Sequence, residues 1–389
     1  MNKKIAIIGA NEFQNRLILK AKEIGYETHV FAWSSGDIGE ASADYFYPIS
    51  VTDLDNIYLT CKSLNIDAVC SVSSDLTNIA VNYVAERLGL TGHSINCINI
   101  STNKLLMRKK LYGYCPIPWF QNIQEAKDLA LDSAKFPLIV KPIDRSGSRG
   151  VSLIQTKKEL DSAIKISLSH SFTDSILVEE YIDGNEYSIE SISQNGKHKV
   201  LQITQKITSG APNFIEIAHI APAVLSLEEY LKIEAITINA LTALDIKNGA
   251  SHTEVKINFK GQLSLIEVGS RMGGDFIGSD LVPMNTGYDY LRTVLDVSLG
   301  IDIDIENIVI NQDDRFYSLA LFYFSESDYL KAKSIFEIDG VRITDEGKSS
   351  CFSGVVESSA DRYGYTVFKL PIKHLTRVLD IIQVKNDTV

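Results

Sequence analysis

The chain has 389 residues, 45% of them apolar, and this length and composition predict a globular protein with two or three compact units. Its 49 acidic residues outnumber its 38 basic residues, and the net charge of −11 argues against a general binder of nucleic acids or anionic membranes. There is no cleavable signal, no apolar run near the ~20 residues of a membrane span and no CxxC pair among the 5 cysteines, so we expect a cytoplasmic protein with reduced thiols.

The first hundred residues alternate between short apolar segments and segments with helical spacing. The expected strands cover residues 5–9, 28–33 and 68–72, and the expected helices cover residues 13–24, 54–64 and 80–88. Such alternation predicts a parallel sheet with helices on its faces. The loop after the first strand holds one glycine, Gly9, where a dinucleotide-binding loop needs three. We therefore expect a Rossmann-like unit that is not the nucleotide site.

The pattern changes near residue 116, where prolines mark a boundary. The unit that follows, residues 119–175, holds an apolar strand at 136–140, a polar glycine loop and a helix that begins with a capping box of Thr156 and Glu159.

Strands dominate from residue 176 onward. Asn195-Gly196 is the strongest hairpin signal, and Ser226 with Glu229 begins a helix that ends near residue 244. The last segment, from about residue 312, carries two further strands and is expected to form a smaller α+β cap.

Lys141 directly follows an apolar strand and precedes a loop of small polar residues that ends at Gly150. Successive backbone N–H groups in such a loop can form a nest that binds an anion, and Lys141 and Arg149 add positive charge. It is not a Walker loop, because the lysine precedes the glycines and no helix follows at once. The alternative is an exposed hairpin loop with incidental charge.

The stretch 176–190 contains an acidic strand. Glu186, Ser188 and Glu190 share one face, because side chains alternate between the two faces of a strand. The pattern is typical of a half-exposed strand with a solvated acidic face.

A third segment places two carboxylates opposite each other. Residues 252–259 alternate, and if Lys260-Gly261 forms a two-residue turn, Glu254 lies across from Glu267. Carboxylates with Cβ atoms ~5 Å apart repel unless a cation lies between them, and oxygen ligands on a rigid sheet suit Mg²⁺. A register slip of one residue or a longer turn would separate the pair. Arg271, on the same face if the strand continues, would offer its guanidinium to an anionic substrate.

The carboxylate pair, the lysine-led glycine loop and the acidic strand together indicate nucleoside triphosphate chemistry without a Walker motif. On these residues the chain resembles the ATP-grasp superfamily of carboxylate–amine ligases, and within it is most similar to the L-amino-acid ligase, or dipeptide synthetase, branch. The resemblance runs from about residue 5 to residue 370. The segments that carry it are VKPIDRSGSRGV (140–151), LVEEYIDGNEYSIE (177–190), HTEVKI (252–257) and IEVGSRMGGDF (266–276).

The resemblance implies an ATP-grasp fold of the α/β and α+β classes. Residues 1–100 would form the N-terminal Rossmann-like parallel-sheet domain, and residues 101–178 the small lid subdomain with the phosphate loop. Residues 179–389 would form the larger C-terminal α+β domain, with its cap at about 312–389.

An ATP site is implied at the junction of the small and large units. Lys104 and Lys141 resemble the lysines that hold the α- and β-phosphates, and residues 144–150 resemble the loop that closes over them. Glu179 and the backbone at Ile182 would meet the adenine edge, and Glu186 would meet the ribose hydroxyls. The full set of implied ATP-binding residues is Lys104, Lys141, Ser146, Gly147, Ser148, Gly150, Glu179, Glu180, Ile182 and Glu186.

The resemblance also implies a metal site and a catalytic arginine. Glu254 and Glu267 match the carboxylates that bind two Mg²⁺ ions, or Mn²⁺ in their place, in agreement with the register argument. Arg271 matches the arginine that binds the substrate carboxylate and then the acyl-phosphate, and the implied catalytic residues are Arg271, Lys141 and Gly147.

The implied substrate-binding residues are Glu216, His219, Arg271, Gly273 and Gly274. Glu216 and His219 are similar to a segment that places an acid and a histidine near the amino-acid amine in dipeptide ligases, although a lone histidine on a strand is more often structural. The chain departs from many ATP-grasp enzymes at Gly269, where they carry an asparagine that ligates metal. Its loss would weaken one metal site or leave a water in its place, but the amino-acid-ligase branch often has a small residue here.

The activity implied is an ATP-dependent ligation in which a carboxylate becomes an acyl-phosphate and is joined to an amine, with release of ADP and phosphate. Two L-amino acids giving a dipeptide are the expected substrates. The alternatives are an ATP-grasp enzyme of the carboxylating or purine-pathway type, and an inactive ATP-binding scaffold. The expected partners are small-molecule carboxylates and amines, without nucleic acid or membrane. Homodimers are common among relatives, but no sequence feature here establishes one.

Overall fold

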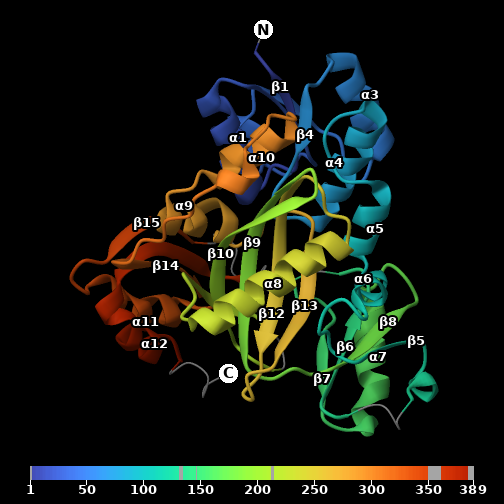
Figure 1. Cartoon of the computed structure of the whole chain (residues 1–389), viewed down its shortest axis with the longest axis vertical. Coiled ribbons are helices and arrows are strands. Elements are labelled where there is room, and N and C mark those ends of the chain that lie inside the picture. Colours follow the sequence, from blue (N-terminus) through green and yellow to red (C-terminus); the bar gives the residue numbers. More distant parts are fainter. Residues whose placement is uncertain (1, 131–134, 146, 212–213, 349–360, 384–389) are drawn as a thin grey trace.

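The computed structural model describes residues 2–130, 135–145, 147–211, 214–348 and 361–383. These residues form an N-terminal unit, a small unit and a large unit, each built on its own β-sheet (Figure 1). No helix in these ranges is long and apolar enough to cross a membrane.

The N-terminal unit is the predicted parallel sheet, with strand order β3-β2-β1-β4. Its elements are β1 (Lys4–Ile8), α1 (Glu12–Ile24), β2 (Glu27–Phe31), α2 (Ile38–Ser42), β3 (Tyr45–Tyr47), α3 (Leu54–Leu64), β4 (Ala68–Cys70) and α4 (Asp75–Leu88). Helices α1 and α4 end at Gly25 (φ 94°) and Gly89 (φ 68°), because glycine adopts this left-handed conformation without strain. The Gln14 side chain fills the loop after β1, where it donates to the Val72 carbonyl at 2.7 Å.

Two helices lead from this unit to the small unit, a four-stranded antiparallel sheet of order β5-β8-β6-β7. The helices are α5 (Ile95–Thr102) and α6 (Lys104–Leu111). The strands are β5 (Phe120–Ile123), β6 (Leu138–Pro142), β7 (Ser152–Ile154) and β8 (Ile176–Glu180). A further helix, α7 (Leu160–His170), packs on this sheet, and 3-10 turns cover Ala126–Asp128 and Lys157–Glu159.

The large unit is an eight-stranded sheet of order β13-β12-β9-β10-β11-β14-β16-β15. Its strands are β9 (Asn185–Gln194), β10 (Lys197–Thr208), β11 (Glu216–Ala221), β12 (Gly249–Ile257), β13 (Leu263–Gly269), β14 (Phe316–Tyr323), β15 (Arg342–Lys348) and β16 (Gly364–Pro371). The predicted Asn195-Gly196 turn joins β9 to β10, and both residues have positive φ, 53° and 78°. The last three strands continue this sheet, so the described residues after about 312 extend the large sheet.

Helices cover the large sheet, and the long helix α8 (Leu227–Ala243) lies across one face (Figure 1). The predicted capping box of Ser226 and Glu229 begins α8. The other helices are α9 (Val282–Thr286), α10 (Tyr290–Ser298), α11 (Glu326–Phe336) and α12 (Leu375–Gln383). A π-helical turn covers Ile277–Leu281, and 3-10 turns cover Ile305–Asn307 and Ile372–His374.

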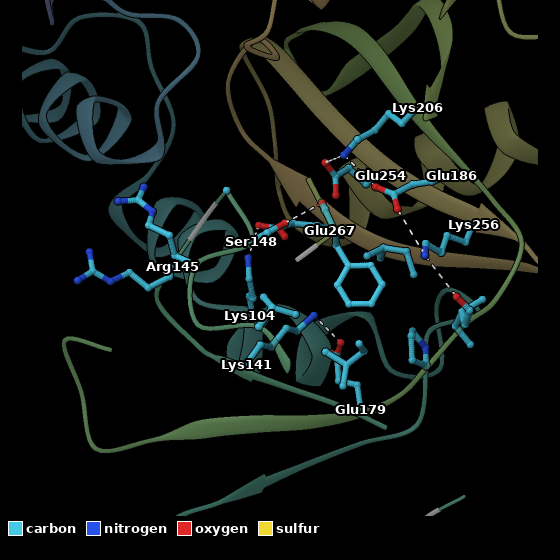
Figure 2. A pocket seen from close by; sticks show the side chains of 18 of the residues that line it. Lys104, Lys141, Arg145, Ser148, Glu179, Glu186, Lys206, Glu254, Lys256 and Glu267 are labelled. Atoms are coloured by element: carbon cyan, nitrogen blue, oxygen red, sulfur yellow. Dashed lines mark hydrogen bonds and ion pairs between the residues drawn. The ribbon is translucent and has the colours of Figure 1, made fainter. Parts of the chain in front are cut away.

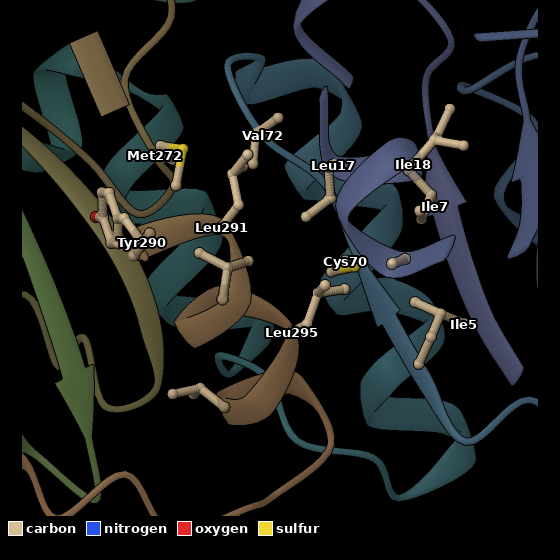
Figure 3. Close-up of a cluster of buried hydrophobic side chains, with 14 of the residues drawn as sticks. Ile5, Ile7, Leu17, Ile18, Cys70, Val72, Met272, Tyr290, Leu291 and Leu295 are labelled. Carbon is tan, nitrogen blue, oxygen red and sulfur yellow. The ribbon is translucent and has the colours of Figure 1, made fainter. Parts of the chain in front are cut away.

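A buried apolar cluster joins the N-terminal unit to the large sheet, with α10 between them (Figure 3). Ile5 and Cys70 from the parallel sheet belong to one cluster with Leu295 of α10, and all three are buried. On the other side of α10, the Tyr290 hydroxyl donates to the Ser191 carbonyl on β9 at 2.7 Å. This packing fixes the N-terminal unit relative to the large sheet.

We predict that Leu295→Ala lowers the free energy of unfolding by about 2–5 kcal/mol, because a fully buried leucine leaves a cavity when it is shortened. Urea denaturation followed by circular dichroism measures the change. Leu330→Ala on α11 is the matched control: its side chain is 53% exposed, and the expected change is at most about 0.5 kcal/mol. Equal losses of unfolding free energy in the two variants would contradict the packing of α10 between the N-terminal unit and the large sheet.

Candidate functional site

A cavity of about 200 Å³ lies between the small sheet and the large sheet. Figure 2 shows charged side chains from both sheets pointing into it. Apolar residues that line it include Pro118, Ile139, Tyr181, Ile182, Phe214 and Ile266. Charged residues that line it include Lys104, Lys141, Glu254, Glu267 and Arg271. The cavity thus combines apolar surface, which suits a planar ring, with charges that suit an anion such as phosphate.

Glu254 on β12 and Glu267 on β13 lie directly opposite each other, as predicted. The two-residue turn on which that prediction rested is wrong. The strands pair only as far as Ile257, and the Asn258 amide donates to the Gln262 carbonyl at 3.0 Å, so three residues lie between these two.

A β-bulge explains why the carboxylates are still opposed. Val255 pairs with Leu265, whereas Glu254 pairs with Glu267, which leaves Ile266 as an extra residue on β13. The extra residue in the turn shifts the register by one, and the bulge shifts it back. The pairing was therefore correct for a reason that the sequence argument did not contain.

A lysine holds each carboxylate of the pair. The Lys206 ammonium lies 2.7 Å from Glu254 Oε1, and Lys104 Nζ donates to Glu267 Oε1. Burial opposes ionisation of Glu254, but the charges of Lys206 and His252 hold its pKa well below the usual range. Both positions thus carry anionic oxygens that are already close to a cation.

His252 bridges this pair to a second buried acid. Its Nδ1 lies 2.6 Å from Glu190 Oε1 and its Nε2 lies 3.3 Å from Glu254 Oε1. Burial lowers the pKa of His252, but the two carboxylates raise it to about 9, so the ring is protonated at neutral pH. The predicted solvated acidic face is therefore wrong, since Glu190 is fully buried.

Lys206 is surrounded by three carboxylates. Its Nζ lies 2.8 Å from Glu186, 2.7 Å from Glu254 and 3.7 Å from Glu216. Burial lowers the pKa of Lys206, but these three charges raise it well above its usual value. Glu186 also lies 3.5 Å from Lys256, whose ammonium donates to the Ile182 carbonyl at 3.4 Å.

Lys141 enters the cavity from β6 and is held by Glu179 on β8. The Lys141 ammonium lies 2.5 Å from Glu179 Oε2, and Arg108 Nε on α6 lies 2.5 Å from Glu179 Oε1. Burial alone would raise the pKa of Glu179, but Arg108 and Lys141 lower it to about 2. Each oxygen of Glu179 thus contacts a cation. Because Arg108 holds one oxygen in place, the other oxygen orients Lys141.

The glycine loop connects β6 and β7 as a hairpin, so the hairpin alternative describes its shape correctly. Gly147 and Ser148 have left-handed backbones, with φ of 67° and 56°. The Ser148 hydroxyl donates to the Phe214 carbonyl at 3.4 Å, so the loop reaches across the cavity to the large unit (Figure 2). A Cβ at Gly150 would lie 3.0 Å from Pro142, which explains the need for glycine. Ser146 lies outside the described residues.

Arg271 lines the same cavity, although β13 ends at Gly269 and does not continue to it as expected. Its Nε donates to Asp75 Oδ1 at 2.8 Å, and its Nη1 donates to the Met272 carbonyl at 3.2 Å. The arginine is thus placed by a loop and by the N-terminal unit rather than by the strand.

The predicted substrate residues are divided. Glu216 and Arg271 are among the described residues that line the cavity, whereas His219, Gly273 and Gly274 are not. His219 is 1% exposed, its Nε2 lies 3.9 Å from Asp275, and burial lowers its pKa, so the ring is neutral. A Cβ at Gly273 would lie 2.3 Å from Glu190, so this glycine permits close packing beneath the site.

Three important residues were not predicted from the sequence. Lys206 is absent from the predicted set, although its position on an alternating strand opposite Glu186 could have identified it. Arg108 on α6 and Asp75 on α4 contact site residues 71 and 196 positions away, and no local pattern indicates such partners.

A family model described as "ATP-grasp domain" matches residues 134–280. The chain is 25% identical over 290 residues to alanine–anticapsin ligase of Bacillus subtilis (strain 168). This alignment covers 67% of this chain and 60% of the relative. It is 23% identical over 258 residues to the N-terminal section of the carbamoyl phosphate synthase large chain of Methanopyrus kandleri. This second alignment covers 65% of this chain and 45% of the relative. The chain therefore spans about half of the length of these relatives.

Among solved structures, the L-amino acid ligase from Bacillus licheniformis superposes with a TM-score of 0.81 at 23% identity, covering 99% of this chain and 98% of that one. Phosphoribosylglycinamide synthetase from Anaerococcus prevotii gives a TM-score of 0.76 at 18% identity, covering 98% of both chains. These similarities confirm the predicted fold.

We predict that Glu179→Gln lowers the free energy of unfolding at pH 7 by about 3–5 kcal/mol, because it leaves Arg108 and Lys141 buried without their anion. The Glu179 pKa is about 2 in the folded chain against 4.5 for a free glutamate, so its contribution is complete above pH 4.5 and is lost as pH falls toward 2. Urea denaturation between pH 7 and pH 3.5 measures the difference between wild type and variant, which should shrink below about pH 4.5. Glu180→Gln, on the next residue of β8, is the control; a similar loss there, or a difference that does not vary with pH, would refute the triad.

Proposed function

Because the chain belongs to the ATP-grasp superfamily, we propose that it is an ADP-forming ligase that joins a carboxylate to an amine, with two L-amino acids as substrates and a dipeptide as product. The observation that carries the proposal is the convergence in one cavity of two opposed carboxylates, two lysines and an arginine. The similarity to alanine–anticapsin ligase and to the L-amino acid ligase fold supports amino acids as the substrates.

ATP would occupy the cavity with its base against the apolar lining and its phosphates beside the lysines. Lys104 and Lys141 neutralise phosphate oxygens, and Gly147 in the glycine loop lets the backbone approach them. Glu180, the last residue of β8, and Ile182, just beyond the strand, supply backbone groups to the adenine edge. Glu186 meets the ribose. The sequence analysis expected Glu179 to contact the adenine edge. In this proposal Glu179 instead orients Lys141.

Mg²⁺ fits the opposed carboxylates, because Glu254 and Glu267 present hard oxygen ligands that already attract ammonium groups. No group of three or more metal-ligating side chains occurs among the described residues, so phosphate and water would complete the shell. When bound, the ion supplies neutralisation of the triphosphate charge.

The reaction then proceeds in two balanced steps. A carboxylate oxygen held by Arg271 attacks the γ-phosphorus, the bond to ADP breaks, and an acyl-phosphate forms. The amine of the second substrate attacks the acyl carbon, phosphate leaves, and the amine loses a proton. Glu216 provides a carboxylate in the cavity for the ammonium group of a substrate. Closure of the glycine loop limits hydrolysis of the intermediate.

We predict that phosphate release from ATP and Mg²⁺ requires particular pairs of L-amino acids. Mass spectrometry of each reaction should detect a product whose mass equals that of the pair less water. Release with bicarbonate or a ribosylamine instead would indicate the carboxylating or purine-pathway alternative, and binding of ATP without turnover on a wide panel would indicate a scaffold.

The cytoplasmic location and the homodimer stay predictions.

We predict that Glu267→Gln reduces turnover by at least about 100-fold, because it removes an anionic ligand at the phosphate end, while the thermal melting curve is unchanged. Glu228→Gln, on the exposed surface of α8, is the matched control and should retain wild-type turnover. Chelation with EDTA should stop the wild-type reaction, and added Mg²⁺ or Mn²⁺ should restore it. Wild-type turnover in Glu267→Gln would remove the metal assignment.

A further inference from the structure

The N-terminal unit contributes one charged side chain directly to the guanidinium that the proposed function assigns to the substrate carboxylate. We propose that Asp75 is a positioning residue for Arg271, and that the Asp75–Arg271 pair limits position 269 to a small side chain. This inference rests on the proposed function for its kinetic test, but its structural premise can be tested separately.

The contact is short and shielded. Arg271 Nε lies 2.8 Å from Asp75 Oδ1, and the two side chains are only 14% and 22% exposed. The second contact of the guanidinium, from Nη1 to the Met272 carbonyl at 3.2 Å, fixes its plane. With Nε and Nη1 engaged, the remaining edge of the fork is presented to a carboxylate.

Asp75 is itself held rigidly. It is the first residue of α4, after the N-cap Ser74, and the first turn of this helix is attached to the segment that follows β13. The Ser73 amide donates to the Met272 carbonyl at 3.1 Å, and Asn78 Nδ2 donates to both oxygens of Ser270 at 3.0 Å. The carboxylate is thus placed by a helix terminus that is anchored on both sides of the arginine.

Gly269 lies against this pair. A Cβ at Gly269 would be 3.5 Å from Arg271 Cζ and 3.5 Å from Asp75 Oδ1, which is ordinary contact. An alanine therefore fits, but the amide of an asparagine would extend into the pair. An asparagine at this position, as in many ATP-grasp enzymes, would compete with Asp75 and Arg271 for the same space.

The kinetic test compares Asp75→Asn with Asp161→Asn, which removes an acid from the first turn of α7. If Asp75 positions Arg271, Asp75→Asn lowers kcat/KM for the carboxylate substrate by about 10- to 100-fold, as expected for a misplaced binding group, while the KM for ATP stays within about twofold. Asp75→Glu, which keeps the charge, should recover part of the loss. Equal kcat/KM values in Asp75→Asn and Asp161→Asn would overturn the proposal.

The glycine provides a second test with its own matched control. Gly269→Asn should reproduce the effect of Asp75→Asn, and combining the two should cause no further loss, because both disrupt one contact. Gly269→Ala should retain most of the activity. Full activity in Gly269→Asn, or multiplicative losses in the double variant, would contradict the shared space.

A stability cycle separates this inference from the proposed function. If no pair of substrates is ligated, the function fails, but urea denaturation of Asp75→Asn, Arg271→Gln and the double variant still reports on the pair. A double variant that loses less stability than the sum of the single variants supports the contact. Additive losses would refute it.

Discussion

The buried ion pair between Arg108 and Glu179 is the contact on which the rest of the site depends. Arg108 is 1% exposed and comes from α6, Glu179 comes from the small sheet, and the second oxygen of Glu179 holds Lys141. Arg108 also donates from Nη2 to the Ile266 carbonyl at 2.7 Å, on the bulge of β13. One guanidinium thus connects the linker helix, the small sheet and the large sheet. These contacts must stay formed, because a buried charge without its partner would strongly destabilise the fold.

The same constraint organises the large sheet. The side chains that face the cavity from β9, β10 and β12 are charged and largely buried, and their acids contact cations on other strands of the sheet. Lys206 is central because it contacts three carboxylates at once. Such a network holds anions and cations in fixed positions, and this arrangement suits a cavity that receives a charged molecule.

The sequence predicts features that arise from local pattern and fails where distant parts meet. Alternation predicted the strand that carries Glu254, and the spacing of apolar residues predicted α1, α3 and α4 of the N-terminal unit. The turn after β12 was predicted one residue too short, because Phe259 continues the alternation although it belongs to the turn. The contacts of Arg108 and Asp75 join segments 71 and 196 residues apart, which only packing determines.

The bulge at Ile266 separates the tip of the β12–β13 hairpin from its functional end. Beyond the bulge, β12 is held on its other edge by β9, where His252 pairs with Glu190 and Glu254 pairs with Ser188. The tip carries Phe259, which is 81% exposed. Because the opposed carboxylates are positioned by β9 and the bulge rather than by the turn, the tip is a permissive place for a fluorescent label or a short peptide tag.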